Sequence, residues 1–209
     1  MASATCQCGK VVIQFTSNKP RVSTECCCDS CFNRVGFLAD RRRRGSSSPE
    51  DTSNSGKPIV NMKWDNRVTI VRGREQLFAY KLTPETKVFN IATKCCHSFL
   101  FGRNATYDAH CLTTNEADLV WGDQYQRIQP SSRWFVNQWT DARRATLEPL
   151  MGIWVDSEGN LDGEKGWEAV FENHLAAMNA PILKDAVGET FDEILQSLGR
   201  IDIVSELDK

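Results

Sequence analysis

Cysteine is the residue type whose spacing in this chain points most clearly to chemistry. Eight of the nine cysteines fall into three short runs, Cys6-Gln7-Cys8, Cys26-Cys27-Cys28-Asp29-Ser30-Cys31 and Cys95-Cys96. Thiolates one or two residues apart can converge on one soft cation from a single turn, and the usual occupant is Zn²⁺ with four tetrahedral ligands. The pattern therefore predicts metal binding. The plainer alternative is a set of buried thiols that act as small apolar side chains.

The three runs divide into two candidate sites. Cys26, Cys28 and Cys31 can place three sulfur atoms on one ion and leave the fourth zinc position for water or substrate, which is the arrangement of catalytic zinc sites. Cys6 and Cys8 offer two ligands, and the obvious residues to complete that site are Cys95 and Cys96. The two remaining cysteines, Cys27 and Cys111, are expected to be plain thiols.

The adjacent pair Cys95-Cys96 admits three arrangements. Both sulfur atoms can join Cys6 and Cys8 on one ion, which needs a tight turn because neighbours in a strand point to opposite faces. Alternatively, Cys96 joins Cys6 and Cys8, and Cys95 closes the site of Cys26, Cys28 and Cys31, which would make that site structural. In the third arrangement His97 supplies an imidazole ligand.

Composition limits the classes of protein to which the chain can belong. A length of 209 residues favours one domain with an extension, and 41% hydrophobic residues suit a globular core. The net charge of −2 gives no push toward nucleic acid or a membrane surface. No stretch approaches the ~20 apolar residues of a membrane span, and the first residues contain no apolar run typical of a secretory signal. We expect an intracellular protein, cytoplasmic or nuclear, whose thiols stay reduced.

The elements that must position the cysteines read mainly as strands. Residues 1–111 are interpreted as a small β domain with its cysteines in the turns, and residues 112–209 as a C-terminal extension. In the extension, apolar spacing predicts helices over 166–179 and over 191–198, the second ending at Gly199. Residues 40–58, which include Arg41 to Arg44, contain few apolar residues and are expected to form a flexible surface loop. Strands are expected at 10–15, 21–24, 68–71, 76–80, 87–91 and 99–101.

The order of these motifs resembles the glutathione-dependent formaldehyde-activating enzyme family, which also includes the centromere protein V proteins. The resemblance covers about residues 5–108. It is carried by Cys6-Gln7-Cys8-Gly9-Lys10-Val11, the run from Cys26 to Cys31 with Gly36 after it, Gly73, Leu77 and Tyr80, and Cys96-His97-Ser98-Phe99-Leu100. The chain departs from the family pattern at three positions, where it has Cys27 for a histidine, His97 for a glycine and Thr93 for a cysteine.

The resemblance implies a β-tent fold, in which zinc pins two small antiparallel sheets together, here with the α-helical extension added. It implies one structural zinc and a second, catalytic zinc on Cys26, Cys28 and Cys31, where the thiol of glutathione would bind. The family reaction joins formaldehyde to glutathione to give S-(hydroxymethyl)glutathione, and its reverse is a carbon–sulfur lyase reaction.

Two functions therefore compete. The first is a zinc-dependent carbon–sulfur lyase or synthase acting on a small thiol such as glutathione, with Lys94, Arg103 or Arg34 as candidate cations for its carboxylates. The second is a non-catalytic scaffold or binding module in which both zinc ions are structural. The fourth ligand at Cys26, Cys28 and Cys31 separates them. The sequence predicts no membrane partner, no nucleic-acid partner and no particular oligomeric state.

Overall fold

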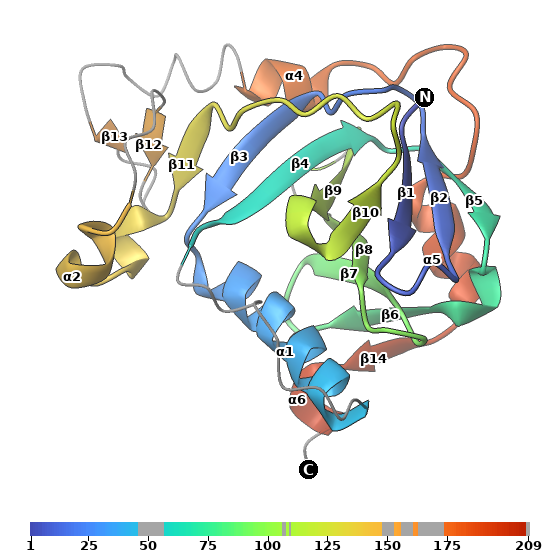
Figure 1. Ribbon diagram of the computed structural model, residues 1–209, viewed down its shortest axis with the longest axis horizontal. Helices are drawn as coiled ribbons and strands as arrows, with labels where there is room; N and C mark the ends of the chain where they lie inside the picture. The colour runs from blue at the N-terminus through green and yellow to red at the C-terminus, as the bar shows by residue number, and fades with distance from the viewer. Residues whose placement is uncertain are drawn as a thin grey trace.

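The chain folds into two β-sheets with few helices, as the computed structural model shows (Figure 1). The residues that the structure describes are 1–45, 57–105, 108, 110–147, 153–155, 161–162 and 174–207. The smaller, antiparallel sheet has the order β10 (Leu119–Trp121), β1 (Ser3–Cys6), β2 (Val12–Phe15) and β5 (Val68–Arg72). The expectation of a mainly β protein with two sheets is confirmed.

The larger sheet is mixed and has ten strands in the described residues. Its centre is antiparallel, whereas β11 pairs parallel to β3 and β14 pairs parallel to β6. In spatial order the strands are β13 (Leu161–Asp162), β12 (Ile153–Val155), β11 (Ser132–Trp134), β3 (Val22–Cys26), β4 (Ile59–Asp65), β9 (Cys111–Asn115), β8 (Phe99–Asn104), β7 (Val88–Thr93), β6 (Leu77–Lys81) and β14 (Ile201–Ile203).

Side chains of both sheets form the main core. Along β1 and β2 every second residue is buried, which is the period that gives a sheet one apolar face. The ring of Phe15 from the small sheet stacks on Trp64 from the large sheet, with centroids 4.1 Å apart. The two sheets are therefore joined by apolar packing as well as by any metal at the turns.

Strand β4 was not expected from the sequence, because it carries polar residues at alternate positions. Met62 and Trp64 point into the core, and Lys63 and Asp65 on the opposite face are also buried. Lys63 Nζ lies 2.7 Å from an Asp108 carboxylate oxygen, and Asp65 pairs with Arg21. Partners remote in sequence thus allow a charged strand to occupy the middle of the sheet.

The prediction of a loop over residues 40–58 is wrong for residues 40–45. These residues end helix α1 (Asp29–Gly45), and residues 46–56 lie outside the described part of the chain. Leu38 is fully buried and packs α1 against the large sheet. Arg42, Arg43 and Arg44 of the arginine run lie in the last turn, where cations interact favourably with the helix dipole. Three of its members have partners, since Arg42 lies 3.7 Å from Asp118, Arg41 lies over the ring of Phe37, and Arg43 pairs with Asp40.

Residues after 111 contribute to both sheets. The boundary expected at residue 111 falls at the first residue of β9, in the middle of the large sheet, and β10 completes the small sheet. The helix predicted over 191–198 is confirmed as α5 (Phe191–Leu198), with Gly199 in the left-handed region at its end. Of the helix predicted over 166–179, only residues 174–179 are described, and they include α4 (Ala176–Asn179).

The remaining short helices connect the strands. They are α2 (Asp141–Arg144), α6 (Val204–Leu207) and three single 3₁₀ turns, η2 (Arg74–Gln76), η3 (Glu116–Asp118) and η4 (Val136–Gln138). Among the described residues, no helix has both the length and the apolar character needed to cross a bilayer.

Candidate metal centres

The turn between β1 and β2 presents the first two cysteines. Cys6 ends β1 and is buried, and Cys8 is exposed in the turn. Gly9 has φ of 74°, a conformation that favours glycine, and its N–H donates to the carbonyl of Cys6 at 2.8 Å. The N–H of Val11 points at Cys6 Sγ at 3.3 Å. A tight turn with an N–H directed at sulfur thus holds both thiols on one side of the chain.

The turn between β7 and β8 presents the second pair. The N–H of His97 donates to the carbonyl of Thr93 at 3.0 Å, and the N–H of Ser98 donates to Thr93 Oγ1 at 3.1 Å. His97 adopts a positive φ of 51°, at the position where the resembled family has glycine. Thr93 therefore contributes hydrogen bonds that close the turn, and the sulfur atoms come from Cys95 and Cys96.

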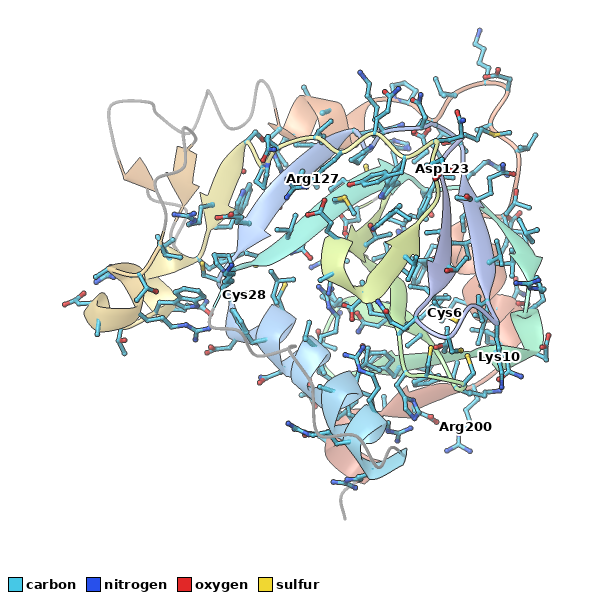
Figure 2. The ribbon with its side chains drawn as sticks, in the orientation of Figure 1. Cys6, Lys10, Cys28, Asp123, Arg127 and Arg200 are labelled. Carbon is cyan, nitrogen blue, oxygen red and sulfur yellow. The ribbon has the colours of Figure 1, made fainter. Side chains whose placement is uncertain are left out.

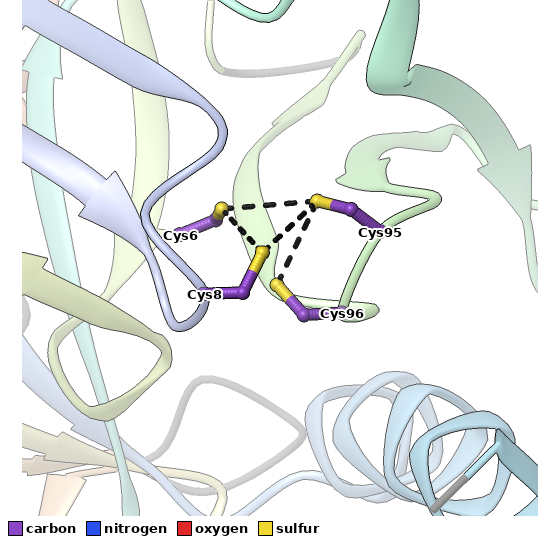
Figure 3. Close-up of side chains that lie close together, drawn as sticks. All are labelled: Cys6, Cys8, Cys95 and Cys96. Atoms are coloured by element: carbon purple, nitrogen blue, oxygen red, sulfur yellow. Dashed lines mark hydrogen bonds between the residues drawn. The ribbon is translucent and has the colours of Figure 1, made fainter.

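The two turns bring four sulfur atoms together, as Figure 3 shows. The distances are 3.6 Å for Cys6–Cys8, 3.9 Å for Cys6–Cys95, 3.4 Å for Cys8–Cys95 and 3.9 Å for Cys95–Cys96. Zinc–sulfur bonds of about 2.3 Å in tetrahedral geometry place neighbouring sulfur atoms about 3.8 Å apart. The four sulfur atoms, all within 4.8 Å of one another, therefore fit a single tetrahedral ion.

This grouping corresponds to the first of the three arrangements expected for Cys95 and Cys96. Cys95 lies with Cys6 and Cys8, so it does not complete the second site. His97 belongs to neither sulfur group. Its ring meets Phe78 edge-on at 6.4 Å, and burial, with Arg41 and Arg42 nearby, lowers the pKa of His97.

The second group lies where β3 ends and α1 begins. Figure 2 shows Cys28 at this junction, well separated from Cys6. The sulfur atoms of Cys26 and Cys28 are 3.2 Å apart, and those of Cys26, Cys28 and Cys31 all lie within 4.8 Å of one another. Among the described residues no further cysteine, histidine, aspartate or glutamate joins this group.

The start of α1 fixes the position of Cys31, which corrects the expectation that the cysteines of this cluster lie in a turn. The carbonyl of Cys28 accepts from the N–H of Cys31 at 3.1 Å, and Cys28 Sγ receives the same N–H at 3.4 Å. The N–H of Asp29 donates to Gln138 Oε1 at 2.9 Å. Thiolates near a helix N-terminus are favoured by the helix dipole, because the free N–H groups carry partial positive charge.

Each group contains one cysteine that ionises readily. Hydrogen bonds with Cys26 and Cys28 hold the pKa of the Cys31 thiol well below its usual range, and Arg34 and Asn61 add to the effect. Burial opposes ionisation of Cys96, yet hydrogen bonds from Ser98 and Thr93 outweigh it and lower the pKa of Cys96 to about 6. A thiolate in each group provides a point at which a metal ion can enter.

The two cysteines outside the groups behave as core thiols, as expected. Cys27 is fully buried against Val136 and Trp139, and burial raises its pKa to about 12. Cys111 is also fully buried, its thiol donates to the carbonyl of Met178 at 3.1 Å, and burial raises its pKa to about 11.

The candidate cations lie in different places. The Nη2 atom of Arg34 is 3.7 Å from Cys31 Sγ, whereas Arg103 binds Asp192 and the carbonyl of Asp108. Lys94 belongs to the turn of the four-cysteine group and donates to the carbonyl of Glu75. Sequence reasoning missed Arg143, which stacks 3.7 Å above the ring of Trp139 beside the start of α1. No local pattern identifies it, since Trp139 and α1 meet only in the fold.

The two cysteine groups could each hold a metal ion. All seven ligand atoms are sulfur, a soft donor set that selects zinc, copper(I) or iron–sulfur chemistry over magnesium or calcium. In comparisons with known proteins, no protein-family model, no curated protein and no solved structure matches this chain.

Proposed function

We propose that this chain is a zinc protein of the formaldehyde-activating type, with carbon–sulfur lyase or synthase activity on an adduct of a small thiol such as glutathione. The observation that supports it is the three-sulfur group of Cys26, Cys28 and Cys31, to which the described residues add no fourth ligand. A three-ligand zinc site accepts one exchangeable ligand, which is the requirement for catalysis at the metal.

The two groups would serve different purposes. The four sulfur atoms of Cys6, Cys8, Cys95 and Cys96 satisfy tetrahedral zinc completely, so an ion there would pin the turn of the small sheet to the turn of the large sheet. In the β-tent fold that the resemblance implies, zinc likewise joins two sheets. The second ion would sit between β3 and α1, where it joins residues close in sequence and contributes little to the fold.

A zinc ion in the three-cysteine site would hold an added thiol as a thiolate near neutral pH. The chain would supply the rest of the site. Arg34 and Asn61 direct N–H groups at Cys31 Sγ, at 3.7 Å and 3.5 Å, and so keep that sulfur a poor nucleophile. In the synthase direction, the sulfur of the added thiol forms a bond to the aldehyde carbon, and the proton of the thiol ends on the aldehyde oxygen.

The face around Cys28 is suited to the charge of such a thiol. Glutathione carries two carboxylates, and Arg143 presents a half-buried guanidinium over Trp139 at this end of α1. Holding the thiol and the aldehyde together would provide much of the rate increase, because a bimolecular step becomes effectively unimolecular.

The experiment compares the zinc-loaded wild type with Cys28→Ser. NMR exchange spectroscopy measures the rate at which ¹³C-formaldehyde and glutathione combine to S-(hydroxymethyl)glutathione and separate again. We expect the wild type to increase the exchange rate above the uncatalysed rate, and Cys28→Ser to lose the increase together with one equivalent of zinc. The matched control is Cys111→Ser, which changes a thiol outside both groups and should leave both properties unchanged. Two tightly held ions with no rate increase would support the scaffold function instead.

A further inference from the structure

Arg34 is buried at the centre of the interface between α1 and the large sheet. Only 6% of its surface is exposed, and its guanidinium lies 4.3 Å above the ring of Phe99. Its Nη2 atom donates to Asn61 Oδ1 at 3.0 Å and to Asn115 Oδ1 at 2.8 Å, and it approaches Cys31 Sγ at 3.7 Å. Two amide groups from different strands therefore aim this cation at the three-cysteine group.

The hydrogen bonds of this guanidinium include no carboxylate among the described residues. The carboxylate of Asp118 favours the charged form of Arg34 from longer range. Its own close contacts are with other residues, since it accepts a hydrogen bond from Asn115 at 2.8 Å and lies 3.7 Å from Arg42. An arginine side chain stays charged in proteins, and a buried charge is costly unless an opposite charge compensates it. Among the hydrogen-bond partners that the described residues offer Arg34, the sulfur of Cys31 is the one that can carry a negative charge.

We propose that Arg34 is a positioning residue that balances the charge of the metal-loaded three-cysteine site and makes the fourth position selective for an anionic thiolate over a neutral ligand. This inference rests on the proposed function. A zinc ion with three thiolates carries one net negative charge, which Arg34 offsets. Adding a thiolate brings a second negative charge, and a fixed buried cation lowers the cost of that step, whereas a neutral ligand gains nothing from it.

A purely structural role would give a different result. Arg34 also ties α1 to β4 and β9, so its loss would lower stability in either case. The ratio of affinities for an anionic and a neutral ligand at the same metal separates the roles, because lower stability alone changes both affinities together.

The test uses the full chain loaded with Co²⁺, whose visible absorption reports ligand exchange at the open site. The wild type, Arg34→Met and Arg34→Lys are titrated with 2-mercaptoethanol, which binds as an anionic thiolate, and with imidazole, which binds as a neutral ligand. Arg34→Met should lower the thiolate-to-imidazole affinity ratio by about tenfold or more, the size expected for one nearby charge. Arg34→Lys, which keeps the charge, should retain most of the ratio. The matched control is Arg44→Met, at an exposed position in the same helix.

An unchanged ratio in Arg34→Met, with two metal ions bound, would overturn this inference alone. A wild type that binds no metal through Cys26, Cys28 and Cys31 would overturn the proposed function and this inference with it. If Arg34→Met does not fold, the salt dependence of the wild type decides. A buried charge is screened little, so the ratio should change by less than about twofold between low and high salt. A steep fall would assign the selectivity to surface cations.

Discussion

Replacing Cys8 by serine should destabilise the protein far more than its exposed position suggests. Cys8 contributes one of four sulfur atoms that would join two turns of the chain through a single ion. Cys6 and Cys95, the two sulfur-bearing residues linked at 3.9 Å across these turns, are 89 residues apart in sequence. A link that closes a loop of this length removes conformational freedom from the unfolded chain, as a disulfide does.

The loop length sets the expected magnitude. The chain-entropy relation gives about 4–5 kcal/mol for closing a loop of roughly 90 residues, and about 2 kcal/mol for a loop of roughly six. An ion bound by Cys26 and Cys31 would close only the short loop of roughly six residues. For a chain of this size, about 4–5 kcal/mol corresponds to a fall in melting temperature on the order of 10–20 °C.

The assay is thermal unfolding of the zinc-loaded protein, followed by circular dichroism. Cys8→Ser should lower the melting temperature by this amount, Cys28→Ser by less than half as much, and the Cys111→Ser control by the least. Treatment of the wild type with a chelator, which removes both ions, should lower the melting temperature at least as much as Cys8→Ser does. Equal melting temperatures for Cys8→Ser and the wild type would refute a metal link between the turns, and equal shifts for Cys8→Ser and Cys28→Ser would refute the loop-length reasoning.

Two further predictions concern groups away from the cysteines. Burial lowers the pKa of His174 from 6.5 to about 4, so below pH 6.5 the unfolded chain binds a proton that the folded chain refuses. This group alone should lower the free energy of unfolding by about 3 kcal/mol between pH 6.5 and pH 4. Urea unfolding at both pH values should show a smaller decrease for His174→Phe than for the wild type. An equal decrease in the two proteins would exclude the effect. Thr190 caps α5 and exchanges hydrogen bonds with Glu193, so Thr190→Ala should lower the free energy of unfolding by about 1 kcal/mol; a Thr190→Ala variant as stable as the wild type would show that this cap does not hold α5.

The sequence predicted the elements whose signal is local. Strands β2, β5, β6, β7 and β8 have the apolar and β-branched runs that the expected ranges followed, and α5 has helical spacing with a glycine at its end. The association of Cys95 and Cys96 with Cys6 and Cys8 was one of three open arrangements. The hydrogen bonds of the β7–β8 turn decide between them, because they place both sulfur atoms on the side of the β1–β2 turn.

The sequence could not predict the elements whose stability depends on distant partners. Helix α1 was missed because it ends in four arginines, and because the buried positions Arg34, Val35, Leu38 and Ala39 include a cation. Arg34 is accommodated by Asn61 and Asn115, and Arg42 by Asp118, all outside the helix. The same reason hides the link between Arg34 and Cys31, since only the fold brings the two asparagines to the guanidinium.

Anomalous scattering at the zinc edge, from crystals of the full chain, would show whether each cysteine group holds one metal ion. We expect two peaks, one at about 2.3 Å from the sulfur atoms of Cys6, Cys8, Cys95 and Cys96, and one at the same distance from those of Cys26, Cys28 and Cys31. An anomalous map with no peak at either group, or with the sulfur atoms joined to one another as disulfides, would contradict this prediction.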